Sequence, residues 1–268
     1  MRKVLTIFTI IFLLPEIGHT KPYKADFYYP NGSGPFPVVI LSHGAGGPSI
    51  AYQKKAEAMA RNGRAAIVLD HYSVRGDYGA KFRNIPKLAD AREWREKDIQ
   101  DLLRTLKDET KINTDKVVLA GWSAGSGIVL PFFANPRRLT PPEGITIAGV
   151  ILTYPYTAGC YEKIDSFNVP VIIHFGKLDG NDGNPLSGYH CWKEKVEKFS
   201  DNKFPVTFKA YDGAYHGYDL VFLKNRPKRC QKRKYRDGVG KFCMAFNESA
   251  FKQAIVANRK FLKQILGN

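Results

Sequence analysis

The chain has 268 residues, of which 44% are hydrophobic and 25% are charged. This composition excludes disordered, collagen-like and coiled-coil proteins, and no repeat of fixed period interrupts it. The 41 Lys and Arg residues against 25 Asp and Glu residues give a formal net charge of +16, which favours anionic partners and carries no information on the fold. Length and composition predict one globular domain with a large core.

The N-terminus resembles a secretory signal peptide. Two basic residues precede an apolar run from Val4 to Leu14, and small or polar residues continue as far as Thr20. The run is too short to cross about 30 Å of hydrocarbon, so a retained anchor is the weaker alternative, and an N-terminal element packed on the body is another. We predict that residues 1–20 are removed, with the cleavage point left open. Residues 21–268 then form a single secreted or periplasmic domain with no integral membrane span.

Strand and helix patterns alternate along the rest of the chain. Apolar runs of strand length alternate with segments of helical periodicity. The expected strands cover residues 25–29, 38–41, 65–69, 117–120, 147–152, 171–175 and 206–210, and the expected helices cover residues 50–61, 87–107, 123–134, 192–199 and 248–266. This alternation predicts an α/β fold with a mostly parallel, twisted sheet and helices on both faces.

In such a sheet, reactive side chains stand in loops at the carboxyl ends of the strands. Residues 121–125 read Gly-Trp-Ser-Ala-Gly, directly after the strand expected at 117–120 and before a helical pattern. This is the G-x-S-x-G elbow in its required context, a sharp strand-to-helix turn that exposes the hydroxyl of Ser123. A glycine-rich packing turn with an idle serine is the alternative.

A serine nucleophile needs a histidine base, and the base needs a carboxylate that fixes its tautomer. Asp179 and His216 each follow an expected strand, in the chain order Ser, Asp, His. The sequence therefore predicts a triad of Ser123, Asp179 and His216, with Asp182 as the competing acid. His174 falls inside an expected strand and is interpreted as a core residue.

The developing oxyanion of an acyl transfer needs two backbone N–H donors. Ala124, directly after the nucleophile, is expected to supply one. The second is expected from residues 43–47, which read His-Gly-Ala-Gly-Gly and whose small side chains let the backbone approach a substrate. Ala45 is the predicted donor in that loop.

Together these segments resemble the α/β-hydrolase superfamily and, within it, the dienelactone hydrolase family, from about Pro37 to Leu266. The matching pieces are the loop at His43, the segment 70–76, the elbow at Ser123, the G-x-x-D at Asp179 and the His-Gly at His216. The resemblance implies a sheet of about seven to eight strands and hydrolysis of esters or lactones. Dienelactone hydrolases use a cysteine nucleophile in the cytosol, so this exported serine version is interpreted as a carboxylesterase-like hydrolase.

The resemblance also implies expectations about the substrate site. Arg75 matches an anion-binding arginine of the family and is a candidate contact for a substrate carboxylate, with a plain surface arginine as the alternative. Related hydrolases insert a cap where only residues 153–168 separate two strands here, so no cap domain is expected. The open site is expected to be lined by Trp122 and Tyr154, unless these aromatics are ordinary packing residues.

The four cysteines form an even set behind an export signal, where thiols oxidise. Two disulfides are expected. Pairing of neighbours along the chain, Cys160 with Cys191 and Cys230 with Cys243, is one of three possible connectivities, and all three remain open. No metal and no cofactor are expected, because the chain has no C-x-x-C motif and no His pair at helical spacing.

A basic loop insertion is expected at about residues 218–247. It holds a run of eight basic and no acidic residues, namely Lys224, Arg226, Lys228, Arg229, Lys232, Arg233, Lys234 and Arg236. Such a run is usually a solvated face, and the sharper hypothesis is docking to an anionic surface or polymer. Nucleic acid is not an expected partner, because aromatic interleaving is limited to Tyr235.

The sequence therefore predicts an exported serine hydrolase that cleaves a small-molecule carboxylic ester through an acyl-enzyme. Two alternatives remain open at this point. One is an exported peptidase or amidase with the same triad, and the other is a non-catalytic polyanion-binding protein on this fold.

Overall fold

The computed structural model describes residues 23–75, 88–136, 139–155, 164–179, 188–199, 201–235 and 238–267. The expected signal peptide, residues 1–20, lies outside these ranges. No helix in these ranges is long and apolar enough to cross a membrane.

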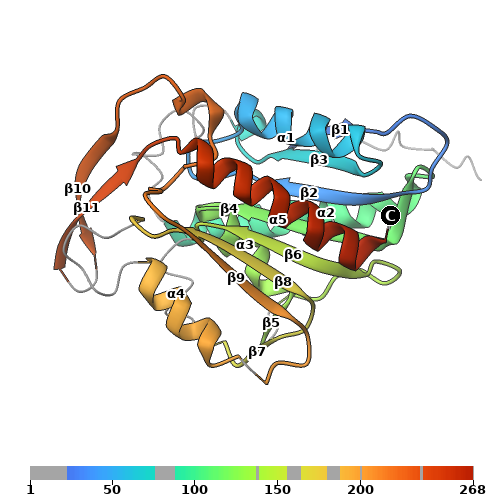
Figure 1. Ribbon diagram of the computed structural model, residues 1–268. Helices are drawn as coiled ribbons and strands as arrows, with labels where there is room; N and C mark the ends of the chain where they lie inside the picture. The colour runs from blue at the N-terminus through green and yellow to red at the C-terminus, as the bar shows by residue number, and fades with distance from the viewer. Residues whose placement is uncertain are drawn as a thin grey trace, which may run out of the picture.

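A seven-stranded sheet forms the centre of the described part of the chain, in the order β1-β3-β2-β4-β6-β8-β9 (Figure 1). Its strands are β1 Lys24–Tyr28, β2 Phe36–Ser42, β3 Ala65–Asp70, β4 Ile112–Trp122, β6 Ile147–Thr153, β8 Val171–Gly176 and β9 Val206–Tyr211. β1 runs antiparallel to β3, and the other neighbours are parallel. The predicted α/β architecture with a mostly parallel sheet is confirmed.

Helices cover both faces of this sheet. They are α1 Ile50–Arg61, α2 Leu88–Thr105, α3 Ala124–Val129, α4 Gly188–Glu197 and α5 Glu248–Leu266. α5 crosses the front of the sheet in Figure 1, whereas α2 lies behind it. The Lys55 ammonium of α1 lies 5.6 Å from the Phe251 ring of α5, so α1 and α5 share a face. Because both faces are covered, the apolar runs of the central strands are almost entirely buried, as their continuity predicted.

The helix predicted over residues 123–134 is shorter in the structure. α3 ends at Val129, a 3-10 turn follows over Leu130–Phe132, and Ala134–Asn135 form strand β5, which pairs with β7, Ser166–Phe167. Pro131 explains the change, since it has no backbone N–H and cannot continue an α-helical ladder.

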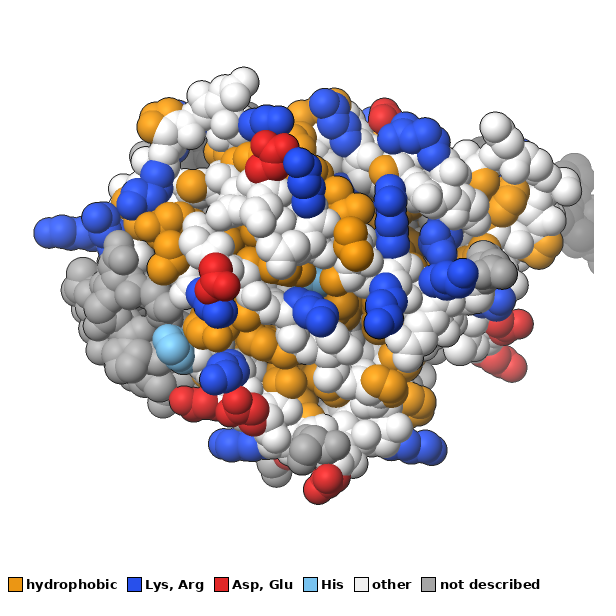
Figure 2. Space-filling model, in the orientation of Figure 1, with side chains coloured by type: hydrophobic (Ala, Val, Ile, Leu, Met, Phe, Trp, Pro, Cys, Tyr) orange, Lys and Arg blue, Asp and Glu red, His pale blue; other side chains and the backbone are white. Residues whose placement is uncertain are grey.

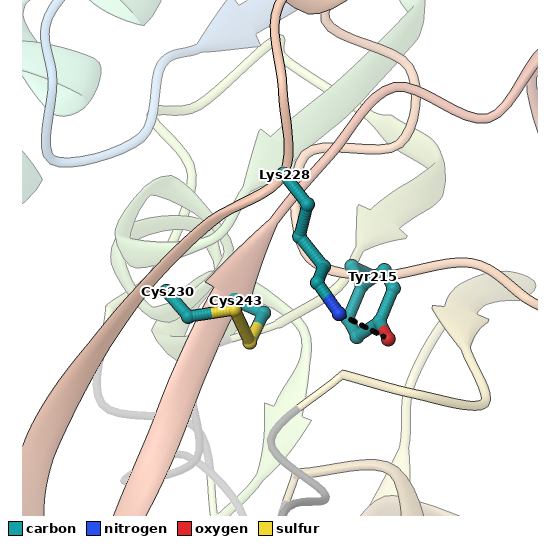
Figure 3. Close-up of a disulfide and its surroundings, with 4 residues drawn as sticks. All are labelled: Tyr215, Lys228, Cys230 and Cys243. Atoms are coloured by element: carbon teal, nitrogen blue, oxygen red, sulfur yellow. Dashed lines mark hydrogen bonds between the residues drawn. A yellow bond between two sulfur atoms is a disulfide. The ribbon is translucent and has the colours of Figure 1, made fainter.

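The predicted basic loop contains a β-hairpin. β10, Arg229–Tyr235, pairs antiparallel with β11, Gly238–Met244, and the register sets Cys230 opposite Cys243. These two cysteines form a disulfide across the hairpin, as one of the open pairings predicted (Figure 3). Cys191 is also disulfide-bonded, and Cys160 lies outside the described residues.

Candidate active site

Ser123 stands at the turn between β4 and α3. Its backbone has φ 51° and ψ −120°, a strained conformation for a residue with a side chain. A Cβ atom on Gly121 would lie 2.6 Å from the Gly125 carbonyl oxygen, and one on Gly125 would overlap the backbone of Ser42. Only glycine fits at either position, which explains why the elbow needs both.

The predicted nucleophile, base and acid lie in one hydrogen-bonded chain. The Nε2 atom of His216 is 2.9 Å from the Ser123 Oγ atom, and its Nδ1 atom is 2.8 Å from Oδ2 of Asp179. A carboxylate only accepts, so Nδ1 carries the proton and Nε2 accepts from the serine hydroxyl. Asp179 and His216 are buried, whereas Ser123 is half-buried and reachable. Asp182, the competing acid, lies outside the described residues.

Backbone hydrogen bonds join the loops that carry the acid and the base. After β8, the Lys177 N–H donates to the carbonyl of Tyr211, the last residue of β9, at 2.9 Å. The Leu178 N–H donates to the carbonyl of Ala214, in the loop after β9, at 3.0 Å. A Cβ atom on Gly176 would overlap the Ala214 backbone, so the loops approach closely only because of this glycine. The contact between Asp179 and His216 is therefore set by the backbone on both sides.

The loop after β2 approaches Ser123 from the other side. A Cβ atom on Gly44 would lie 3.3 Å from the Ser123 Cβ atom. Gly44 N–H donates to the Tyr52 hydroxyl at 3.0 Å, and the His43 Nδ1 atom lies 2.7 Å from the Gly44 carbonyl oxygen. Ala45 and Ala124, the predicted oxyanion donors, are half-buried and directly follow Gly44 and Ser123.

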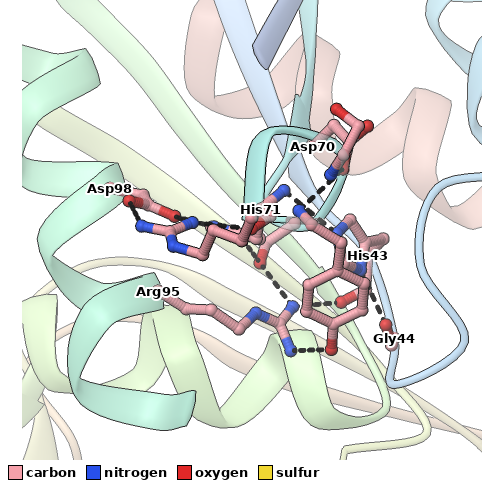
Figure 4. Close-up of polar contacts among 10 residues, drawn as sticks. His43, Gly44, Asp70, His71, Arg95 and Asp98 are labelled. Carbon is pink, nitrogen blue, oxygen red and sulfur yellow. Dashed lines mark hydrogen bonds and ion pairs between the residues drawn. The ribbon is translucent and has the colours of Figure 1, made fainter. Parts of the chain in front are cut away.

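A buried polar network supports this loop from behind (Figure 4). The His43 Nε2 atom accepts from the His71 N–H at 3.3 Å, and Arg95 donates to the His43 carbonyl. Burial and the nearby Arg95 charge hold the pKa of His43 and the pKa of His71 well below the usual range. His43 is therefore neutral with its proton on Nδ1, which makes it a donor to Gly44.

The same network contains a second Ser-His-Asp contact that the sequence analysis missed. The His71 ring lies 2.8 Å from Asp98 through Nδ1 and 3.3 Å from the Ser42 Oγ atom through Nε2. The exposed fractions of Ser42, His71 and Asp98 are 0%, 0% and 1%, so substrate has no access to this serine. No local pattern marks these three residues, because they come from three separate elements.

Arg75 is engaged within the protein. Its guanidinium forms two hydrogen bonds to Asp98, at 2.6 and 2.8 Å, and lies 4.2 Å from the centre of the Trp94 ring. A third bond goes to the His71 carbonyl at 2.6 Å. The residue is therefore not a plain surface arginine, and its contact with a substrate carboxylate stays a prediction.

Trp122 and Tyr154 are buried and do not line an open site. Both donate to the carboxylate of Asp219, the indole at 2.9 Å and the hydroxyl at 2.6 Å, and Lys55 lies 3.1 Å from the same group. The Tyr154 ring is 4.4 Å from the His216 ring, so this cluster packs against the base. Burial raises the pKa of Asp219, but Lys55 and the two donors outweigh burial and leave that pKa lowered.

His174 is fully buried and lies 2.7 Å from the Tyr211 hydroxyl and 2.8 Å from the Asn258 side chain, as expected of a satisfied core histidine. In the ranges that the structure describes, no group of three or more His, Cys, Asp or Glu side chains is placed to hold a metal ion.

Comparisons with known proteins identify the family and the fold. The family model for the dienelactone hydrolase family matches residues 24–266. Thermogutta terrifontis esterase Est2 with bound propionate is 17% identical, with a TM-score of 0.63 over 91% of this chain and 90% of that chain. The same esterase phosphorylated by paraoxon is 16% identical, with a TM-score of 0.62 over 91% and 90% of the two chains.

A third solved structure is the dienelactone hydrolase-like promiscuous phosphotriesterase P91 from metagenomic libraries. It is 18% identical, with a TM-score of 0.62 over 90% of this chain and 92% of that chain. No curated protein sequence matches the chain. The sheet order and the family match over nearly the whole described chain lead to one conclusion: this protein is a member of the dienelactone hydrolase family, with the α/β-hydrolase fold.

Proposed function

We propose that this protein is a serine hydrolase that cleaves carboxylic esters through an acyl-enzyme. The observation that carries the proposal is the pair of contacts at His216, 2.9 Å to the Ser123 hydroxyl and 2.8 Å to the Asp179 carboxylate. These distances suit proton transfer from the nucleophile to the base, with the carboxylate stabilising the imidazolium that forms.

The proposed reaction has two halves. The Ser123 oxygen attacks the ester carbonyl while His216 takes the hydroxyl proton, and the N–H groups of Ala45 and Ala124 stabilise the oxyanion. His216 then gives its proton to the leaving alcohol, which leaves an acyl-serine. In the second half His216 takes a proton from water, the hydroxide attacks the acyl carbon, and Ser123 regains its proton as the acid leaves.

Relatives support a short acyl group. Solved structures of the esterase Est2 hold propionate or butyrate, and others carry a phosphoryl or phosphonyl group from paraoxon or sarin. By analogy with that esterase, we propose that esters with short acyl chains are substrates of this protein and that organophosphates modify its Ser123.

The test is the mass of the protein after treatment with a fluorophosphonate probe, with Ser123→Ala run in parallel. A single adduct on the wild type and none on the variant is expected, since only an activated serine reacts. Hydrolysis of 4-nitrophenyl butyrate is expected to fall by at least about 10⁴-fold in the variant. A folded wild type without adduct or turnover would contradict the proposal and favour a binding protein on this fold.

A matched ester and anilide separate the esterase from the peptidase or amidase that the same triad also allows. We expect the butyrate ester to be turned over far faster than the butyryl anilide, and a preference for the anilide would assign the alternative.

The proposal includes export of the chain. It is supported by the basic and apolar leader in residues 1–20 and by the Cys230–Cys243 disulfide, which persists in oxidising compartments. N-terminal sequencing of protein recovered outside the cytoplasm is expected to begin near Lys21. Recovery only in the cytoplasm with an intact Met1 would contradict export.

A further inference from the structure

The basic hairpin, defined as residues 224–244, is attached to the loop that carries His216. The Phe242 ring centre lies 4.8 Å from that of His216, and Ala245 N–H donates to the His216 carbonyl at 3.3 Å. Directly before β10, the Lys228 ammonium donates to the Tyr215 hydroxyl at 3.2 Å (Figure 3). The hairpin therefore stands directly beside the proposed general base.

The basic hairpin concentrates the charge of the chain. It holds nine basic residues and one acidic residue, a formal net charge of +8 out of +16. The exposed cations Arg226, Lys228, Arg229 and Lys232 have no carboxylate partner among the described residues, whereas Lys224 lies 3.7 Å from Glu248. Repulsion among these cations is unfavourable, and a bound polyanion would relieve it.

The cations are carried on a fixed and extended frame. Cys230 and Cys243 are covalently joined at the start of the hairpin, so the strands cannot separate there. β10 has seven residues and spans about 23 Å at about 3.3 Å per residue. This length exceeds a Debye length of about 8 Å at physiological ionic strength, so a single carboxylate bound at one end would be screened from the cations at the other end. A polymer with repeated negative charges could contact cations along the whole strand.

The surface has few apolar side chains to insert into a lipid interface. Among the hairpin residues whose side chains the structure describes, 224–232 and 241–244, no large hydrophobic side chain is exposed, and Phe222, just before the hairpin, has an exposed fraction of 37%. Interfacial binding needs an apolar face beside the basic one. The observations favour a hydrated polymer over a membrane.

We propose that the basic hairpin binds an anionic polymer and holds ester groups of that polymer at Ser123. The substrate class is then a carboxylic ester carried on a polyanion. This inference rests on the proposed esterase function, because it assigns the substrate of the same site. The polymer lies along β10, and the ester reaches Ser123 past Phe242 and His216.

The test compares two matched polymers, butyrylated dextran and butyrylated carboxymethyl dextran, which carry the same ester on a neutral and an anionic chain. At low salt the wild type is expected to show at least about a tenfold higher kcat/KM on the anionic polymer. The ratio is expected to approach one at about 0.5 M salt, since the attraction is screened.

The variant Arg226→Gln/Arg229→Gln/Lys232→Gln leaves the contact of Lys228 with Tyr215 in place. It is expected to lose this preference at low salt and to keep its turnover of 4-nitrophenyl butyrate within about twofold. A control removes the same charge elsewhere, at exposed residues away from the hairpin: Lys198→Gln/Arg259→Gln/Lys260→Gln. The control is expected to retain the preference for the anionic polymer.

An equal kcat/KM on both polymers, or a preference that the control loses as much as the hairpin variant, would overturn the inference. Binding to anionic phosphatidylglycerol vesicles without any polymer preference would overturn it in favour of a membrane. Failure of the wild type on 4-nitrophenyl butyrate is a different result, because it removes the proposed function and not the docking surface alone.

Discussion

Two hydrogen-bonding partners of the buried His43 ring impose one tautomer. The His71 N–H occupies its Nε2 atom, so its proton is on Nδ1 and points at the Gly44 carbonyl. A trans peptide is planar, so fixing the Gly44 carbonyl also fixes the N–H of Ala45 in the opposite direction. One buried neutral histidine thus sets the direction of a proposed oxyanion donor.

This geometry predicts different outcomes for two His43 variants. His43→Leu removes the donor and is expected to lower kcat about 100-fold with KM within about threefold, because the oxyanion contact forms only in the transition state. In His43→Asn the side-chain amide can stand in for Nδ1–H and is expected to recover most of the loss. Steady-state kinetics and melting temperatures check this. An equal loss of kcat in both variants would indicate that the hydrogen bond from His43 to the Gly44 carbonyl does not contribute to catalysis.

Asp219 is a buried carboxylate with three partners, and its lowered pKa has a defined consequence for stability. Its folded pKa lies below the ordinary aspartate value of 3.8, so its contribution to stability is present above pH 3.8 and is lost as the pH falls through the folded value. Asp219→Asn is expected to cost about 3 kcal/mol at pH 7, because Lys55 loses its charge partner.

Urea unfolding at pH 7 and at pH 3 or below measures this effect. The difference between wild type and Asp219→Asn is expected to shrink at the lower pH, because the unfolded chain binds a proton at Asp219 at a higher pH than the folded protein does. Asp212, 88% exposed and 2.7 Å from Lys177, provides the control, and Asp212→Asn is expected to change stability by less than about 0.5 kcal/mol. A gap that widens on acidification would contradict the assignment.

Among the elements, the short helix α3 after the serine elbow contains two glycines with different surroundings. Gly125 faces the backbone of Ser42 and His43, whereas a Cβ atom on Gly127 meets nothing within 4 Å. Gly125→Ala is therefore expected to cost about 3 kcal/mol or to prevent folding. Gly127→Ala is expected to stabilise the protein by about 0.5 to 1 kcal/mol, because alanine restricts the unfolded chain more than glycine.

Thermal unfolding of the two variants checks this pair. Equal effects of both substitutions would show that helix propensity and not the approach of β2 decides the residue at 125. The comparison also explains why G-x-S-x-G was informative in the sequence, since its two outer positions exclude every side chain on steric grounds.

Helices with a regular apolar periodicity and distinct boundary residues have the ends that the sequence predicts. α1 and α5 begin and end at the predicted residues, because each combines helical periodicity with a clear boundary, and the Asn247 side chain caps α5 at 3.0 Å from the Ala250 N–H. The hairpin β10–β11 was predicted as a loop. Its strands carry exposed cations in place of an apolar face, so periodicity could not reveal them.

At the scale of the whole molecule, positive charge is not confined to the hairpin. The face crossed by α5 carries Lys and Arg side chains across its width, with few Asp and Glu among them (Figure 2). Such a field raises encounter rates with anionic partners in general, so a control that removes charge from this face is needed to identify the hairpin as the specific surface.

The first described residues of the chain are part of the folded body. Tyr23 is buried and β1 pairs with β3 along its full length, so the folded body includes the chain from about residue 23. Removal of residues 1–20 is expected to leave ester turnover and the melting temperature unchanged. Removal of residues 1–28 deletes β1 and is expected to lower the melting temperature by several degrees, which thermal unfolding would measure. Destabilisation by the shorter truncation would contradict a cleaved leader.

Local patterns in the sequence predicted the seven strands of the central sheet, the five helices, the elbow at Ser123 and the candidates Asp179 and His216. Burial on both faces forces continuous apolar runs, and a strained turn forces glycines, so both leave a local pattern. No such pattern predicted that Trp122 donates to Asp219, 97 residues away, that Arg75 pairs with Asp98, or that Phe242 packs on His216, and these contacts are visible in the folded chain alone. A buried polar group is stabilised by whichever partner the fold brings to it, and that partner has no fixed spacing along the chain.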